Sequence, residues 1–162
     1  AVTWDVTYFN QQITDAIIFD LVSYSGYVQI TGESEFTGIE AAVDWQLAER
    51  FSVGGFVSQL DAEDSQDAQL PYRPELTMQL NARYDSGDSS WMLLARHTAD
   101  RADEFGSALS DYTVMDATFS RKVTDSIDLS VRAENLTNQA YTDIAGYRSP
   151  RRALYVGIEL AI

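Results

Sequence analysis

The sequence predicts an all-β fold, specifically an antiparallel transmembrane β-barrel, on the basis of three observations. Apolar and polar residues alternate with a period of two, the alternating segments are short, and short and long connections follow one another between them. Strands are expected at residues 2–20, 34–47, 51–60, 75–84, 90–99, 111–123, 126–134 and 152–162. The sequence has no run of about 18 apolar residues, so no transmembrane helix is expected.

The segment 75–84 shows the alternation most clearly, because Met78 and Leu80 stand between Gln79 and other polar residues. The apolar faces are expected to point outward to lipid, and the acidic and hydroxyl faces to point inward. The first segment begins with the same alternation but changes phase near Asn10–Gln12. This change predicts either a β-bulge or the point where the strand leaves the membrane.

Three short connections, at 48–50, 85–89 and 124–125, alternate with long ones at 21–33, 61–74, 100–110 and 135–151. Short turns at one end and long loops at the other are typical of an outer-membrane barrel, and eight strands place both chain ends on the short-turn side. Trp4, Trp45 and Trp91 lie near that side and predict an aromatic belt at one membrane interface. The alternative is that each tryptophan fills the core of a sandwich.

Composition excludes several classes of function. The net charge of −14 argues against nucleic-acid binding, which needs a basic surface. There is no cysteine, and His97 is the only histidine, so neither a zinc site nor a catalytic set is indicated. His97 is expected to be an interfacial barrel residue. We therefore expect no cofactor, no catalytic residues and no enzyme activity.

The last strand carries a possible assembly signal. A polar or aromatic residue, a glycine two positions later and alternating apolar residues at the end are the pattern by which the barrel-assembly machinery recognises outer-membrane proteins. Tyr155, Gly157, Leu160 and Ile162 match this pattern, although Ile162 stands where an aromatic residue is usual.

Four segments strengthen one family resemblance: GESEFTGIEAAVDWQL (32–47), LPYRPELTMQLNARYD (70–85), AENLTNQAYTD (133–143) and GYRSPRRALYVGIEL (146–160). In their order and spacing they resemble the C-terminal barrel of a TonB-dependent outer-membrane receptor of the siderophore, cobalamin or haem type. One departure is Arg151, which stands where the family has glycine before the arginine that Arg152 matches.

The resemblance implies a barrel of about 22 strands around an N-terminal plug. Residues 1–162 are expected to be a single C-terminal barrel segment, corresponding to the last eight strands, without a plug domain or a TonB box. The segment would supply wall and extracellular loops to a receptor that imports an iron–siderophore, haem, cobalamin or a glycan. Implied partners are outer-membrane lipid, lipopolysaccharide, the barrel-assembly machinery, TonB through the N-terminal part of the parent, and a small nutrient in a Gram-negative outer membrane.

The long loops contain two sets of candidate binding residues. Aromatic side chains and one arginine are candidates for a flat or anionic ligand, with loop-to-loop packing as the alternative: Tyr24, Tyr27, Phe105, Tyr141, Tyr147 and Arg148. Four carboxylates, Asp61, Glu63, Asp64 and Asp67, form a possible calcium loop without EF-hand spacing. Asn135 also begins a formal glycosylation sequon, which the family segment already explains.

Two other functions remain open from the sequence: a self-contained eight-stranded outer-membrane barrel of structural or adhesin type, and a soluble lipocalin-like binder with its apolar face inside. Charge favours the large barrel. The inward faces are expected to carry eight carboxylates against Arg83, Arg96, Lys122 and Arg132, which is costly inside a narrow lumen. The carboxylates are Asp5, Glu40, Asp44, Glu75, Asp116, Asp128, Glu134 and Glu159.

Overall fold

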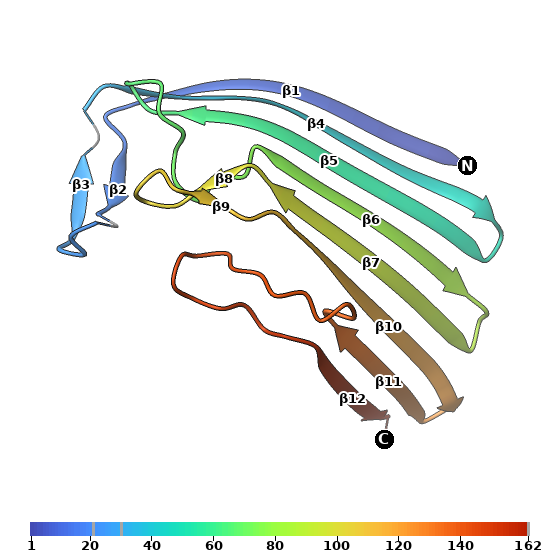
Figure 1. Ribbon diagram of the computed structural model, residues 1–162. Helices are drawn as coiled ribbons and strands as arrows, with labels where there is room; N and C mark the ends of the chain where they lie inside the picture. Colours follow the sequence, from blue (N-terminus) through green and yellow to red (C-terminus); the bar gives the residue numbers. More distant parts are fainter. Residues whose placement is uncertain (21, 30, 162) are drawn as a thin grey trace.

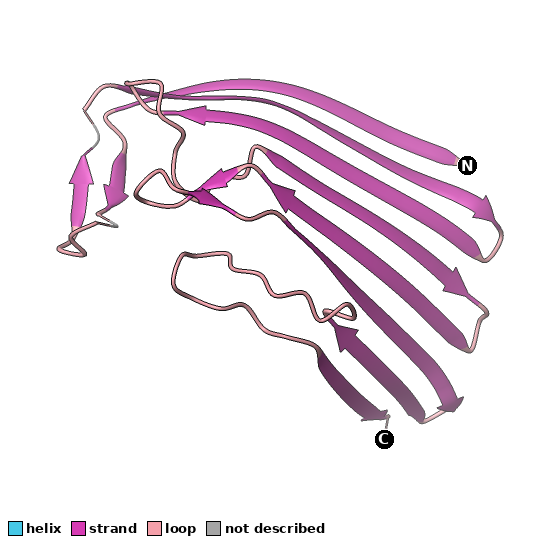
Figure 2. Cartoon of the chain, in the orientation of Figure 1, coloured by secondary structure: helices cyan, strands magenta, loops and turns pink. Residues whose placement is uncertain are grey.

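The computed structural model describes residues 1–20, 22–29 and 31–161, and their main feature is a curved eight-stranded sheet (Figure 1). Its strands are β1 (Val2–Thr14), β4 (Glu33–Ala48), β5 (Phe51–Glu63), β6 (Leu76–Asp85), β7 (Ser89–Ala99), β10 (Tyr112–Thr124), β11 (Ile127–Glu134) and β12 (Ala153–Leu160). Two small hairpins extend from it, β2 (Ile17–Phe19) with β3 (Tyr27–Gln29), and β8 (Arg101–Ala102) with β9 (Ala108–Leu109). Figure 2 shows strands and loops throughout the described residues.

The strand order is β1-β4-β5-β6-β7-β10-β11-β12, with every neighbouring pair antiparallel. The prediction of eight main strands is therefore confirmed, and both termini lie at the short-turn end (Figure 1). Within the described residues β1 and β12 are the two edges of the sheet and do not pair with each other. The sheet is open, so the alternative of a barrel closed on these eight strands is wrong for this structure. No helix among these residues is long and apolar enough to cross a membrane.

One face of the sheet is apolar from edge to edge. Residues that are directly opposite in antiparallel strands share a face, so the register defines rows across the sheet. One complete row consists of Val2, Trp45, Val53, Ala82, Leu93, Ala117, Ala133 and Leu154. The side chains at its ends are more than half exposed, with Val2 at 55% and Leu154 at 68%. A continuous apolar surface of this extent needs a nonpolar surrounding.

The opposite face is polar and charged. A representative row contains Asp44, Gly54, Asn81, Leu94 and Asp116. Arg96 pairs with Asp116 across this face at 2.8 Å, and Ser90 and Ser120 share a hydrogen bond of 2.7 Å. The charges are unevenly placed, because Asp5, Glu40 and Asp44 at the β1–β4 edge have no ion pair within the described residues.

Near the long-loop ends of β1, β4 and β5, the apolar face becomes polar and the polar face becomes apolar. Beyond the apolar pair Tyr8–Ile39, the next residues on that face are Asn10 and Thr37, and the Asn10 amide donates to Thr37 Oγ1 at 2.9 Å. On the other face Phe9 now stands opposite Gly38. The register from Val2 to Thr14 has no irregularity, so of the two alternatives for the phase change near Asn10–Gln12 the bulge is wrong. The phase change is therefore an exchange of polarity between the faces of an unbroken strand, and the point where the strand leaves the membrane stays a prediction.

The first strand also ends earlier than the alternation predicts. Asp15 has a φ of 54°, and its amide donates to Gly32 O at 2.8 Å. This left-handed residue turns the chain into the separate hairpin β2–β3. Bulges occur instead next to two short turns, between Gln46 and Ala48 in the β4–β5 pair and between Lys122 and Thr124 in the β10–β11 pair.

Gly38 is the one glycine of β4, and a close contact explains it. A Cβ atom there would lie 2.6 Å from the Phe9 ring and 2.5 Å from the backbone oxygen of Gln59. The ring of Phe9 therefore occupies the space that a side chain at Gly38 would need. This close approach gives a physical reason for the glycine in the segment 32–47.

Few residues of the described structure are fully buried. The buried apolar residues are Ala62, Ala99, Ala102 and Val114, and the buried polar ones are Ser34, Arg101 and Asn135. Such a small core fits a single layer of sheet rather than two packed layers. The tryptophans Trp4, Trp45 and Trp91 are 72%, 47% and 53% exposed, so the sandwich-core alternative is wrong.

Candidate ligand-binding loops

The hairpin β2–β3 carries the first two aromatic candidates. Phe19 contacts Tyr24 and Tyr27 edge-on, with ring centroids 6.1 Å and 5.6 Å apart. The Asp20 carboxylate accepts hydrogen bonds from the Ser23 hydroxyl and from the amides of Ser23 and Val22, and these bonds lower the pKa of Asp20. The ionised carboxylate thus holds the tip in shape, while Tyr24 and Tyr27 remain 62% and 77% exposed.

The hairpin β8–β9 carries Phe105 at its tip. The Asp103 carboxylate accepts from the amides of Phe105 and Ser107 at 2.9 Å and 2.8 Å, and Gly106 takes a φ of 76°. A neighbouring loop braces the hairpin, because Tyr72 donates its amide to Ala102 O at 2.9 Å and its hydroxyl to the Glu104 carboxylate. Burial, followed by these contacts with Glu104, raises the pKa of Tyr72. Phe105 itself is 68% exposed.

Asn135 closes the long loop between β11 and β12. Its amide nitrogen donates to Gln139 O at 2.9 Å and Pro150 O at 3.1 Å, and its side-chain oxygen accepts from Gln139 N at 2.8 Å. Its backbone amide donates to the Asp116 carboxylate at 2.9 Å. Asn135 is 2% exposed and adopts a φ of 50°, which asparagine tolerates better than most residues. The asparagine of the formal sequon is therefore buried and holds the two ends of this loop together.

Arg101 joins this loop to the β8–β9 hairpin. Its guanidinium is buried and donates to Ser110 O at 3.0 Å and Thr142 O at 3.2 Å. The same group lies 3.8 Å from the Asp143 carboxylate and 4.9 Å from the centre of the Tyr112 ring. Its Nε is a buried nitrogen without a hydrogen-bond partner among the described residues. A buried cation of this kind fixes the relative position of the two segments.

A polar groove lies between these two segments, with a volume of about 760 Å³. One wall comes from the junction of β9 and β10, and the other from the loop 139–151. Tyr141, Arg148 and Arg151 line it, and Tyr141 stacks on Tyr112 with ring centroids 4.5 Å apart. Ser110 and Thr142, which accept from Arg101, are on opposite walls, so the buried guanidinium spans the groove from behind.

The structure therefore brings only part of the aromatic set together. Tyr141 and Arg148 share the groove, whereas Tyr147 is 71% exposed next to it. Tyr24 and Tyr27 lie on β2–β3, and Phe105 lies on β8–β9 (Figure 1). Sequence reasoning missed Arg101 and Arg151 as parts of this site, because neither stands in an aromatic loop motif.

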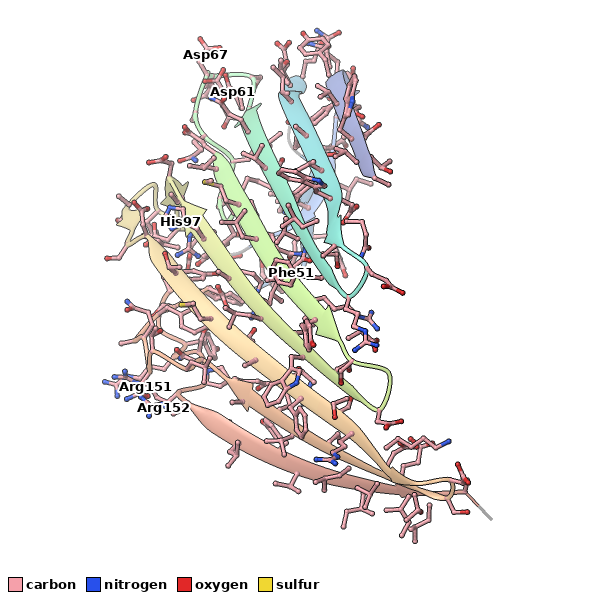
Figure 3. All side chains as sticks on the ribbon, turned by 90° about the vertical axis from the view of Figure 1, so that its right-hand side faces the viewer. Phe51, Asp61, Asp67, His97, Arg151 and Arg152 are labelled. Carbon is pink, nitrogen blue, oxygen red and sulfur yellow. The ribbon has the colours of Figure 1, made fainter. Side chains whose placement is uncertain are left out.

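The acidic loop does not form a ready-made metal site. Across residues 1–20, 22–29 and 31–161 no three His, Asp or Glu side chains are placed to hold a metal ion. Asp64 instead accepts from the amides of Gln66 and Ala68 at 2.8 Å and 3.1 Å. The carboxylates are nevertheless crowded, and repulsion led by Asp61 raises the pKa of Glu63. Figure 3 shows Asp61 and Asp67 at the far end of β5, away from Arg151 and Arg152 beside β12. Calcium binding at Asp61, Glu63, Asp64 and Asp67 stays a prediction.

His97 lies on the apolar face of β7, opposite Met78 and Thr113. Its Nδ1 forms a hydrogen bond of 2.9 Å with Thr113 Oγ1. Figure 3 places it near the long-loop end of the sheet. The interfacial position expected for His97 in the barrel stays a prediction.

The final strand places the assembly-signal residues on alternating faces. Leu160 is 64% exposed on the apolar face opposite Ile127. Gly157 is on the polar face, where a Cβ atom would lie 2.6 Å from the Ser130 hydroxyl. Tyr155 lies on that face too, with the Arg132 guanidinium 4.7 Å from its ring centre. Ile162 lies outside the described residues.

The architecture defines the class of protein. An open antiparallel sheet with one apolar face, one charged face, short turns at one end and long loops at the other forms part of the wall of a transmembrane β-barrel. Residues 1–136 match the family described as TonB dependent receptor-like, beta-barrel, and the chain belongs to this family.

Known proteins agree with this assignment. The vitamin B12 transporter BtuB of Vibrio cholerae serotype O1 is 27% identical over 169 residues, which cover 97% of the chain and 26% of the relative. The chain thus spans about a quarter of the length of such relatives. The copper transporter OprC superposes with a TM-score of 0.83 at 18% identity, covering 99% of this chain and 29% of that one. The siderophore receptor PiuA from Acinetobacter baumannii gives 0.78 at 16% identity, covering 98% and 26%.

Proposed function

We propose that the chain forms wall and extracellular loops of an outer-membrane receptor that imports a scarce nutrient by a TonB-dependent route. Residues 1–162 would be one segment of the C-terminal barrel of a longer protein. The candidate nutrients are an iron–siderophore, haem, cobalamin or a glycan. Vitamin B12, copper and a siderophore appear in the names of its relatives, which supports nutrient import as a class without selecting a substrate.

The observation that carries this proposal is the apolar face and its limits. Along β4 the face runs from Leu47 to Ile39 and then becomes polar at Thr37. That stretch measures about 27 Å along the strand and about 20 Å along the membrane normal at a tilt of about 40°. The lipid-facing band of an outer-membrane barrel is about 25 Å tall, so the apolar stretch comes within about 5 Å of that height. The short-turn end would then face the periplasm, and the long loops would face the outside.

The loop groove is the proposed contact for an anionic group of the nutrient. Arg148 and Arg151 line it together with Asp111, and the charge of the buried Arg101 behind both walls is offset by Asp143 at 3.8 Å. Arg151 has fewer donors available for a ligand, because its guanidinium donates to Asn138 O at 2.7 Å. Arg148 has no ion pair within the described residues. A guanidinium offers paired donors to a carboxylate or phosphate, which makes Arg148 the main binding residue.

The function is tested with the full-length receptor in a Gram-negative host from which its own gene has been removed. Uptake of labelled ferric siderophore, haem, cobalamin and an oligosaccharide is measured with and without TonB. We expect uptake of one class only, and only with TonB. Uptake that is equal without TonB, or no uptake of any class by a surface-exposed receptor, would refute the proposal.

The contribution of the groove is tested separately. Arg148→Ala is expected to weaken binding of an anionic nutrient about tenfold, as for a charge-assisted hydrogen bond of about 1.4 kcal/mol. The matched control is Arg50→Ala, which removes an exposed arginine in the short turn between β4 and β5 at the opposite end of the sheet. Unchanged affinity in Arg148→Ala would remove the groove from the binding site and leave transport itself in place.

A further inference from the structure

A second groove lies on the apolar face near the short-turn end. It has a volume of about 390 Å³, and four strands each contribute one aromatic residue to its lining. Trp91 and Phe119 pack against each other with ring centroids 4.2 Å apart, and Phe51 and Tyr84 complete the aromatic wall. Tyr84, Trp91, Phe119 and Val131 are consecutive members of one row across β6, β7, β10 and β11. The groove is therefore formed by the register of these strands on the apolar face of the sheet.

One cation lies beside this groove on the same face. Arg121 is two residues beyond Phe119 on β10, opposite Ser89 and Leu129, so its side chain shares the face of Phe119. It is exposed and has no ion pair or side-chain hydrogen bond within the described residues. Its neighbour Lys122, on the other face, is paired with Asp125 at 3.0 Å. Of the two neighbouring cations on β10, Arg121 is thus the one without an ion pair among the residues that the structure describes.

We propose that Arg121 and the aromatic groove bind one anionic phospholipid of the periplasmic leaflet. The acyl chain lies along Phe51, Trp91 and Phe119, and the guanidinium of Arg121 donates to the headgroup phosphate. This inference rests on the proposed function, which turns the apolar face toward lipid and the short turns toward the periplasm.

Two physical arguments select an anionic lipid. An unpaired arginine at the level of the headgroups is attracted to a lipid of net negative charge, and its planar group fits a phosphate through two parallel hydrogen bonds. The chain as a whole carries a net charge of −14 and repels anionic headgroups. A preference for an anionic lipid would therefore come from a local site and not from the average charge of the surface. Aromatic rings at the same level are favourable at a membrane interface.

The test uses the full-length receptor, purified in detergent, with phosphatidylglycerol and phosphatidylethanolamine of identical acyl chains as probes. Native mass spectrometry reports the lipid retained at increasing collision energy. The receptor is expected to retain phosphatidylglycerol about fivefold more than phosphatidylethanolamine, the effect of about one cation near a lipid surface. Arg121→Gln is expected to abolish the preference, Arg121→Lys to keep part of it, and Lys122→Gln to leave it unchanged. Absence of a preference in the unmodified receptor, or its survival in Arg121→Gln, would overturn the site.

A second measurement separates this site from the proposed function. Lipids with brominated acyl chains quench tryptophan fluorescence on contact. The quenching of Trp91 is the difference in quenching between the unmodified receptor and Trp91→Phe. Quenching of Trp91 without a headgroup preference would reject only the lipid site. No quenching of Trp91 in a folded receptor would show that the apolar face does not meet lipid, which rejects the site and the orientation together.

Discussion

Leu80→Arg is the sharpest test of which face meets the membrane. Leu80 lies in the row Trp4–Val43–Gly55–Leu80–Ala95–Met115, between the short-turn rows and the polar boundary at Asn10 and Thr37. Its side chain is 60% exposed on the apolar face. The residues directly opposite, Gly55 and Ala95, offer an arginine no polar partner.

The expected magnitude follows from depth in the bilayer. An arginine on the lipid face costs about 2–4 kcal/mol at the midplane of a barrel and close to nothing near the interfaces. The matched change Gln79→Arg places the same side chain on the polar face, opposite Phe56 and Arg96. Repulsion from Arg96 adds only about 0.2–1 kcal/mol, and Asp116, already 2.8 Å from Arg96, partly offsets it.

The two variants are compared in the full-length receptor by urea titration in lipid vesicles, with the heat-modifiable shift of the folded barrel on gels as a second readout. Leu80→Arg is expected to lower the free energy of unfolding by at least about 1 kcal/mol more than Gln79→Arg. Equal losses, or a larger loss for Gln79→Arg, would mean that the apolar face does not meet lipid.

Three further predictions concern the loops and the final strand. Asn135→Ala is expected to destabilise the loop 135–152 by about 2–4 kcal/mol, because it removes three hydrogen bonds, each worth about 0.5–1.5 kcal/mol, that the buried Asn135 side chain makes with Gln139 and Pro150. Hydrogen exchange of that loop, with exposed Gln66→Ala as a control, measures the loss. Carboxylate repulsion raises the pKa of Glu63 in the folded chain, so ionised Glu63 destabilises its loop fully above that pKa, and the effect fades as the pH falls through it. Glu63→Gln is therefore expected to protect residues 61–70 from hydrogen exchange at about pH 7 but not at about pH 4. Equal protection at both pH values would contradict this reasoning. Deleting Leu160–Ile162 removes the β11–β12 pairing at Ile127 and is expected to leave the parent unassembled in the periplasm, whereas normal surface levels would reject the assembly signal.

The strands and their faces follow from alternation, which is why the sequence predicts them to within a few residues apart from the first. Val2 and Trp4 identify the apolar face of β1 because a side-chain period of two is a property of the backbone itself. The phase change near Asn10 is visible in the sequence but its cause is not, since a bulge and a boundary between lipid and water give the same pattern.

The missed features depend on contacts between distant segments. Arg101 resembles any loop arginine until the loop after β11 covers it and supplies Thr142 O and Asp143. Asn135 belongs to a recognisable segment, yet it can hold the loop closed only because Pro150, 15 residues away, returns beside it. The hairpins β2–β3 and β8–β9 are only two or three residues per strand, too short for alternation to be distinguished from chance.

The polar face gives the strongest reason to expect a barrel larger than these eight strands. Asp5, Glu40 and Asp44 lie together at the β1–β4 edge, and no ion pair within the described residues neutralises them. Closing β1 onto β12 would enclose these charges in a lumen filled by side chains, where each unpaired carboxylate loses several kcal/mol of solvation. We therefore expect β1 and β12 to pair with other strands of the intact receptor.

Cysteine pairs test this expectation directly, because the segment contains no cysteine of its own. Leu129→Cys with Ile158→Cys is the positive control, since these residues are directly opposite across β11 and β12 and Cα atoms in such pairs lie about 4.5–5.5 Å apart, within disulfide range. Val6→Cys is combined in turn with a cysteine at Leu154, Val156 or Ile158, so that no single register between β1 and β12 is assumed. Under mild oxidation of the folded receptor in its membrane, only the control pair is expected to cross-link. A disulfide between β1 and β12 at any of the three positions would show that the eight strands close on themselves. The unpaired carboxylates would then have to be protonated or neutralised by ordered water and counter-ions inside a narrow barrel.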